Sequence, residues 1–406
     1  MALAAAFSAA PALCAEEPQP AAEIPAPEAP ASGGHPAITL SGEYILDAVA
    51  VARGTATGVR YVDLATLTAA IDLDAAAGWR GGTLVAEVIA GTGQRPNDLA
   101  GTLQGINNSE VPQGRAKLYQ FYLEQQLGAA PVTLRAGFID LNAEFYSNEA
   151  AGLLIAPAFG IGSELAATGP NGPAIFPSTA LTASVRIAPT DETYAALAVV
   201  NAEAGVLGDV GGMAPLLDQG ALLIGEGGWA TPAGKVALGL WRYTDRQDDL
   251  RLTDAAGDPL RQRAQGAYVL LERPVGGRIG PEPDSPRKAA LFVRAGFSDG
   301  NTTPYRGGWQ AGILVNRVLA ARPDSQLSIG ANQAYLSRKF RLNEADAGNP
   351  LRRAETGIEI TYADALAPWL TAQADAQYVR NPGHAPQARD AVIFGLRLTF
   401  AFSHEW

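Results

Sequence analysis

The chain has 406 residues, of which 17% are charged, and it contains 45 Gly and 28 Pro. Its many apolar residues are unlike a disordered tail, and the absence of any run of 18 apolar residues is unlike a helical membrane protein. The net charge of −11 argues against a nucleic-acid partner, because no cluster of Lys and Arg is available to neutralise phosphates.

The first 36 residues divide into a leader and a tether. Residues 1–15 are rich in Ala, Leu, Phe and Pro and end at Ala15, as in the remnant of a secretory signal peptide that lacks its basic start. A start codon placed too far downstream explains the missing charges, and a coincidental Ala-rich leader is the alternative. Cys14 is the only cysteine, and Leu13 before it fits a lipoprotein cleavage site poorly, so cleavage after Ala15 leaves a mature chain without disulfides. Residues 16–36 are rich in Ala, Pro and Glu and predict an extended tether.

From residue 37 to residue 406 the dominant pattern is alternation with a period of two, which predicts a single all-β domain. In the last segment Phe394, Leu396 and Phe400 alternate with small or charged residues such as Gly395 and Arg397. About sixteen segments have the length of a tilted spanning strand: 38–51, 61–76, 82–92, 117–127, 132–140, 181–189, 192–201, 220–229, 235–244, 265–274, 289–298, 309–319, 326–337, 353–363, 369–379 and 390–402.

The connections and the two strand faces distinguish a membrane barrel from a soluble sandwich. Short turns with Gly, Pro or Asp alternate with longer connections such as 242–265 and 340–352, as in outer-membrane barrels. The face opposite the apolar one carries sparse charge, which suits a water-filled lumen better than a solvated exterior. In this interpretation Tyr119, Phe121 and Leu123 share the apolar face. Aromatic residues near segment ends, including Trp229 and Trp369, fit interfacial girdles.

The segment 138–180 is a long connection rich in Gly and Pro that also carries residues typical of protein interiors, including Phe145, Tyr146, Phe159 and Phe176. Connections of this length are functional or disordered, and disorder rarely includes so many aromatic residues. The predicted fold class is therefore a transmembrane antiparallel β-barrel of about 16 strands with a long loop folded into the lumen.

Several ordered motifs resemble the carbohydrate-selective porins of the OprB family. They include Asn142-Ala-Glu-Phe-Tyr-Ser-Asn-Glu-Ala-Ala-Gly152, Phe159-Gly-Ile-Gly-Ser-Glu-Leu165, Phe292-Val-Arg-Ala-Gly-Phe297 and Gln377-Tyr-Val-Arg-Asn-Pro382. The resemblance implies a sixteen-stranded channel in the outer membrane of a Gram-negative bacterium, reached through the periplasm, that passes monosaccharides such as glucose by facilitated diffusion. The expected partners are small sugars, outer-membrane lipid, further copies in a homo-oligomer, and the assembly machinery, which would engage the C-terminal strand that ends at Trp406.

Candidate solute contacts are polar residues on the lumen face and in the long loop, because sugar passage needs groups that replace the water shell of hydroxyls and then release the solute. The predicted constriction consists of Glu124, Arg135, Asn142, Glu144, Tyr146, Asn148 and Glu149, and the predicted lumen lining of Arg294, Glu359 and Arg397. The alternative is that Glu124 and Arg135 only stiffen the wall and that the loop residues satisfy their own backbone.

Catalytic and metal motifs fail in their context, so no enzyme, metal or cofactor is expected. The string Gly296-Phe297-Ser298-Asp299-Gly300 imitates a nucleophile elbow but leads into a turn instead of a helix. His35, His384 and His404 match no metal spacing. Two alternatives to the sugar channel stay open: a general or cation-preferring porin, suggested by the acidic charge, and an exported β-rich glycoside hydrolase that uses two of Glu144, Glu149 and Glu164.

Overall fold

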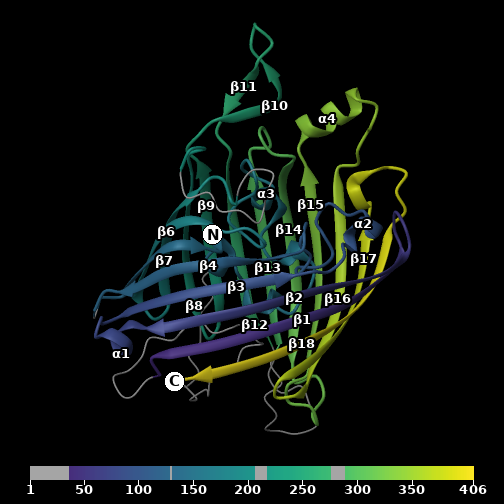
Figure 1. Cartoon of the computed structure of the whole chain (residues 1–406). Coiled ribbons are helices and arrows are strands. Elements are labelled where there is room, and N and C mark those ends of the chain that lie inside the picture. The colour runs from purple at the N-terminus through teal and green to yellow at the C-terminus, as the bar shows by residue number, and fades with distance from the viewer. Residues whose placement is uncertain (1–35, 129, 206–216, 276–288) are drawn as a thin grey trace, which may run out of the picture.

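The computed structural model describes residues 36–128, 130–205, 217–275 and 289–406, so the predicted leader and nearly all of the tether lie outside the described residues. Within the described residues, sixteen antiparallel strands close into one barrel (Figure 1). The barrel strands are β1 Ile38–Arg53, β2 Gly58–Asp72, β3 Gly82–Gly91, β4 Arg115–Gln126, β5 Val132–Ile139, β6 Ala180–Thr190, β7 Thr193–Asn201, β8 Ala221–Thr231, β9 Gly234–Tyr243, β12 Gln265–Val275, β13 Ala289–Ser298, β14 Tyr305–Asn316, β15 Gln326–Leu336, β16 Ala354–Ala367, β17 Leu370–Arg380 and β18 Ala391–Glu405.

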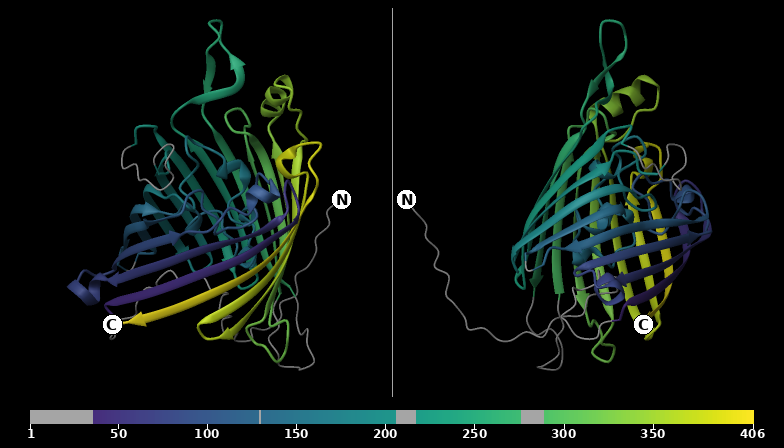
Figure 2. Two further views of the ribbon diagram at one scale, coloured as in Figure 1. Left: turned by 45° about the vertical axis from the view of Figure 1, so that its right-hand side comes forward. Right: turned by 60° about the vertical axis from the view of Figure 1, so that its left-hand side comes forward.

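The barrel closes between its first and last strands. β1 pairs with β18 along nearly its whole length, with Asp47 opposite Arg397, and the backbone of Trp406 donates to Ile38 O at 3.0 Å. In projection the strands of opposite walls cross, because the strands of a closed barrel tilt relative to its axis (Figure 2). The predicted fold class, an antiparallel barrel of about sixteen strands, is confirmed.

The apolar face of the strands points outward. On β9, Leu238 and Leu240 are 57% and 60% exposed, whereas Gly239 between them and Ala237 and Trp241 on either side are buried. The same alternation continues on β18, where Phe394 is exposed and Ile393 is buried. This is the arrangement of a barrel in lipid, and it is the reverse of a soluble sandwich.

The two ends of the barrel differ in their connections. One end, which we call the turn end, has short links such as 191–192, 232–233 and 368–369 and the small helix α1 Leu73–Ala77. The other end, the loop end, has the long connections 92–114, 140–179, 244–264 and 337–353. These contain α2 Asn97–Ala100, η1 Leu141–Ala143, η2 Glu149–Ala151, η3 Pro157–Phe159, α3 Ser163–Ala166, the hairpin of β10 Gln247–Thr253 and β11 Pro259–Gln262, and α4 Arg338–Asp346; η4 Pro382–His384 lies in the last connection. None of the described helices is long and apolar enough to cross a membrane.

A β-bulge in β4 breaks the predicted alternation. The pairing register with β3 shifts between Glu87 and Val88, so that Tyr119 has no partner residue across the ladder. Its side chain is 4% exposed and its hydroxyl donates to Asp140 Oδ2 at 2.6 Å. The prediction that Tyr119 lies on the apolar outer face is therefore wrong, because the bulge turns this ring toward the start of the loop 140–179.

Candidate functional site

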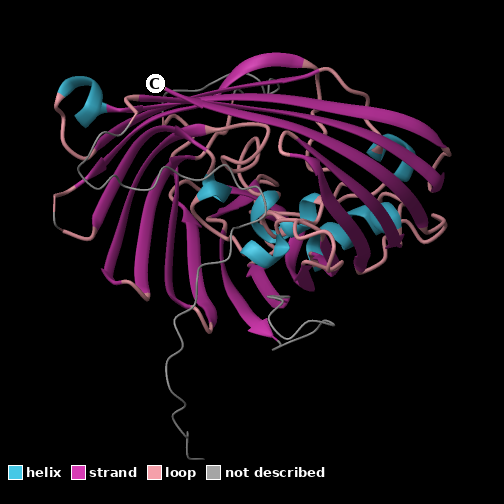
Figure 3. Cartoon of the chain, turned by 90° about the horizontal axis from the view of Figure 1, so that it is seen from below, coloured by secondary structure: helices cyan, strands magenta, loops and turns pink. Residues whose placement is uncertain are grey.

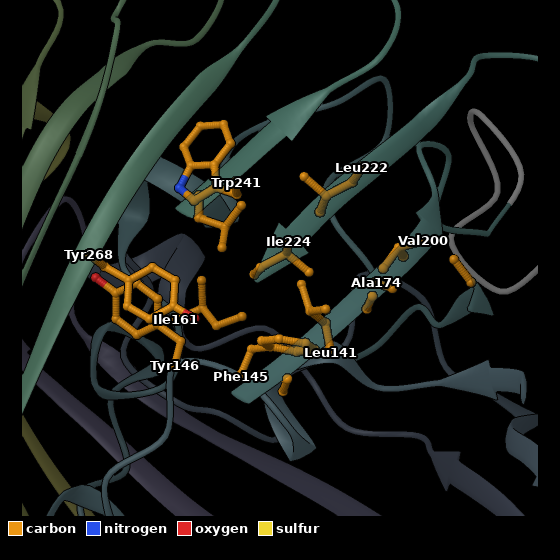
Figure 4. Close-up of a cluster of buried hydrophobic side chains, with 14 of the residues drawn as sticks. Leu141, Phe145, Tyr146, Ile161, Ala174, Val200, Leu222, Ile224, Trp241 and Tyr268 are labelled. Atoms are coloured by element: carbon orange, nitrogen blue, oxygen red, sulfur yellow. The ribbon is translucent and has the colours of Figure 1, made fainter. Parts of the chain in front are cut away.

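The connection 140–179 is an ordered chain of short helical turns. Asp140 caps its first turn by accepting from Asn142 N at 2.8 Å, and Leu141 N donates to Ala174 O at 2.6 Å, which ties the start of the loop to its end. Its apolar side chains pack against buried residues of β7, β8, β9 and β12 (Figure 4). The labelled members of this cluster are Leu141, Phe145, Tyr146, Ile161, Ala174, Val200, Leu222, Ile224, Trp241 and Tyr268.

Inward-facing side chains of β16 and β17 form hydrogen bonds with the backbone of the loop 140–179. Glu359 accepts from Ile155 N at 2.5 Å and from Ala156 N at 3.0 Å. Gln373 Nε2 donates to Leu153 O at 2.7 Å. The segment 153–156 is thus fixed to strands that are far from β5 and β6 around the barrel.

A second set of anchors comes from β8, β9 and β13. Glu226 Oε2 accepts from Tyr146 N at 3.0 Å, and Lys235 Nζ donates to Ser147 O at 2.9 Å. Arg294 Nη1 donates to Gly160 O at 2.8 Å and to Tyr146 O at 3.2 Å. In the view from below, short helical turns lie inside the ring of strands (Figure 3). The loop therefore contacts the inner wall at several separate places.

The shorter loop 92–114 is also bound to the inner wall, a role that the sequence pattern did not predict. Arg397 forms a bidentate pair with Asp47, at 2.8 and 2.7 Å, and its Nη2 also donates to Asn108 Oδ1 at 2.8 Å. Asn107 Nδ2 donates to the same Asp47 carboxylate at 2.6 Å. The sequence does contain a signal for this pair: Asp47 on the first strand and Arg397 on the last strand lie on the faces opposite the large apolar residues.

Glu355 of β16 holds the other side of this loop by accepting from Leu103 N at 3.1 Å and Gln104 N at 3.0 Å. The two loops also touch each other, because Asn108 N donates to Ile155 O at 2.9 Å and Ser163 Oγ lies 3.3 Å from Gln104 Oε1. Together they form one connected network inside the wall.

The residues predicted as lumen lining lie on the inner face but within this network. Arg294 and Glu359 are each 1% exposed and Arg397 is 7% exposed. Each of the three forms hydrogen bonds with a loop or with Asp47, although Nε and Nη2 of Arg294 have no partner among the described residues. In this structure they position the loops, and burial separates them from an open water path.

Glu124 and Arg135 form an ion pair, which the alternative of a stiffened wall also predicts. They are directly opposite on β4 and β5, and Arg135 Nε lies 2.6 Å from Glu124 Oε2. The Arg135 guanidinium lies 5.7 Å from the centre of the Tyr122 ring. The Arg135 side chain is still 19% exposed, so this cluster keeps contact with water.

The remaining predicted loop residues have different surroundings. Asn142 Nδ2 donates to Phe145 O at 3.2 Å, which closes a local turn. Tyr146 is fully buried, with its ring centre 4.1 Å from that of Tyr268 and with a left-handed φ of 63°. Asn148 is buried, Glu144 is half-buried and Glu149 is exposed. Glu149 is therefore the loop member that combines charge with full exposure, whereas Oε2 of Glu144 is buried and has no hydrogen-bond partner among the described residues.

The arrangement does not support a pair of catalytic carboxylates. Glu164 is fully buried and accepts from the Tyr146 hydroxyl at 2.7 Å, and burial raises its pKa. The described residues contain no group of three His, Cys, Asp or Glu placed to hold a metal ion.

A closed sixteen-stranded barrel with an apolar exterior, short turns at one end and long loops at the other is a porin-type barrel of the outer membrane, and not an enzyme. Residues 56–402 match the sequence model of the carbohydrate-selective porin OprB family, and the chain belongs to that family. This confirms the resemblance found in the sequence and places the protein in the outer membrane of a Gram-negative bacterium.

Individual relatives are similar at low identity. Porin B of Pseudomonas aeruginosa is 24% identical over 191 residues, and this match spans 42% of the chain and 41% of Porin B. OprB of Pseudomonas putida, in its high-pH structure, is 19% identical with a TM-score of 0.79 over 91% of this chain and 94% of that one. The outer-membrane channel DcaP of Acinetobacter baumannii is 10% identical with a TM-score of 0.57 over 90% and 97%. The likeness to these structures shows a shared fold.

Proposed function

We propose that this protein is a passive channel for small carbohydrates, monosaccharides such as glucose, with the loop 140–179 folded into the lumen as the filter. The observation that carries this proposal is the anchoring of one loop to separate parts of the inner wall, by Glu359 on β16 and by Glu226 on β8. A loop held at these places narrows the path for solutes, so that molecules of the size of a monosaccharide pass more readily than larger ones.

The polar cluster of Glu124, Arg135 and Glu144, together with Glu149, supplies the solute contacts in this proposal. Guanidinium and carboxylate groups exchange hydrogen bonds with neighbouring hydroxyls, and an aromatic face such as that of Tyr122 suits the apolar face of a pyranose. Arg135 and Glu124 already partner each other at 2.6 Å, so these two groups bind a sugar weakly and release it.

A cation-preferring porin is the second candidate. It is favoured by the net charge of −11 and by the exposed carboxylate of Glu149. Reversal potentials in planar bilayers, measured with glucose as a blocker, distinguish the two functions. A reduction of the current by glucose supports the sugar channel, whereas strong cation preference without a glucose effect would refute it.

The proposed partners follow from the same architecture. Outer-membrane lipid covers the apolar exterior, the assembly machinery engages the C-terminal end of β18, and further copies form a homo-oligomer. Cross-linking of the purified protein in detergent, followed by a denaturing gel without boiling, tests the oligomer: a ladder of discrete species supports it and a single monomer band contradicts it.

A further inference from the structure

Four arginines of this acidic protein gather around one polar cavity at the loop end. The cavity has a volume of about 340 Å³. It is lined by Arg242, Arg246, Gln262, Arg261, Arg263, Gln265, Asp299 and Asn301. Asp299 is the one acidic side chain of this lining, so the cavity is strongly basic although the whole chain carries a net charge of −11.

The cavity lies on the outside of the barrel, at the edge of the apolar belt. Leu238, Leu240 and Arg242 occupy alternate positions on the outward face of β9. Arg242 pairs with Gln265 of β12, and the next outward row below contains Leu240 and Phe297, which are 60% and 58% exposed. The base of the β10–β11 hairpin supplies the other arginines above this row (Figure 1).

The guanidinium groups are only partly neutralised. Arg261 lies 3.5 Å from Asp248, and Arg263 Nε donates to Thr244 O at 2.6 Å. Among the described residues, the side chains of Arg242 and Arg246 make no hydrogen bond or ion pair. Asp299 is engaged by Asn301 N at 2.7 Å. Four cations around one cavity repel each other, and an anion with several oxygens relieves that repulsion.

We propose that this cavity binds the phosphate group of a lipid headgroup in the outer leaflet of the outer membrane. Long loops of such barrels face the cell exterior, so the cavity lies at the height of outer-leaflet headgroups. Arginine is suited to phosphate because its planar fork binds two oxygens at once, and basic clusters next to a membrane attract anionic lipids. The acyl chains of the same lipid lie along Leu238 and Leu240, which a soluble phosphate compound cannot exploit. This site is separate from the solute path and does not depend on the proposed sugar transport.

The test uses the full-length protein and native mass spectrometry after incubation with mixed micelles that contain diphosphoryl lipid A, or lipid A without its phosphates. Wild-type protein is expected to retain the diphosphoryl form, and the double variant Arg242→Gln/Arg246→Gln to lose at least about tenfold in apparent affinity, since hydrogen bonds to charged groups are the strong ones. The matched control is Arg80→Gln/Arg273→Gln, which removes two exposed arginines near the turn end. Heat-modifiable gel mobility shows that each variant is folded.

Three outcomes would overturn the proposal. Equal retention of phosphorylated and dephosphorylated lipid by the wild type would show that the phosphate is not recognised, and this arm does not depend on any variant. An equal loss in the control variant would show a general charge effect. Displacement of the lipid by millimolar inorganic phosphate would identify a free phosphate as the ligand. Retention that needs both the phosphate and the two loop-end arginines supports the site.

Discussion

Replacement of Glu359 by Gln should loosen the loop 140–179 without opening the barrel. The Glu359 carboxylate is 1% exposed and accepts from Ile155 N at 2.5 Å and from Ala156 N at 3.0 Å. Gln has the same shape but offers one acceptor oxygen in place of two, so one of the two buried amides loses its partner. We expect residues 155–156 to detach from the wall more often, while the strand pairing of β16 is retained.

The size of the effect follows from this single unsatisfied amide. A buried donor without an acceptor costs about 1–3 kcal/mol. Because about 1.4 kcal/mol corresponds to a factor of ten in an equilibrium, the detached population should rise by about fivefold to about 150-fold. The bonds from Gln373 to Leu153 O and from Arg294 to Gly160 O are unaffected and limit the detachment to this segment.

Liposome swelling with glucose and with the trisaccharide raffinose measures this change. The ratio of raffinose to glucose rates should rise in Glu359→Gln, and single-channel current noise should rise with it. Glu192→Gln is the matched control, because Glu192 is an exposed carboxylate in the short link between β6 and β7. If the variant is folded by gel mobility and both the rate ratio and the noise equal those of the wild type, the loop is not the filter.

Three further predictions concern other parts of the network. Glu124→Ala or Arg135→Ala should change glucose swelling rates severalfold and leave heat-modifiable gel mobility unchanged; unaltered rates would place the constriction elsewhere. Arg397→Met leaves the buried Asp47 carboxylate without its ion-pair partner and should lower the free energy of unfolding by about 3–5 kcal/mol. The double variant Arg397→Met/Asp47→Leu should recover most of this loss of stability. Denaturant titration of both variants measures the two free energies. Burial lowers the pKa of His384 from 6.5 to about 4. The opened segment therefore binds a proton more readily than the folded one. As the pH falls from 6.5 to 4, the free energy of opening of residues 381–390 should fall by up to about 3 kcal/mol. Amide hydrogen exchange measures this opening, and the same pH dependence in His384→Asn would contradict the assignment.

The strands were predictable because their signal is local. Alternation of residues such as Phe394 and Ile393 reports which face meets lipid, and it does not require knowledge of any distant contact. The bulge at Tyr119 could not be read in this way, since it depends on the contact of its hydroxyl with Asp140 in the loop. One extra residue in a strand reverses the faces without changing the composition.

The inner network was predictable only in part. Alternation places Arg294, Glu359 and Arg397 on the face opposite the apolar one, but the loop groups that they contact have positions that depend on the whole loop. The pair of Glu124 and Arg135 was easier, because both residues lie on neighbouring strands and their register follows from a short turn. The role of the loop 92–114 was missed, since its polar residues resemble those of any solvated connection.

Sugar-by-sugar liposome swelling with the purified protein tests the central claim most directly. A passive monosaccharide channel with the loop 140–179 as its filter should admit glucose and other monosaccharides much faster than di- and trisaccharides, and it should show no strong preference for cations. Equal rates for glucose and for raffinose, or strong cation preference without any effect of sugar, would contradict it.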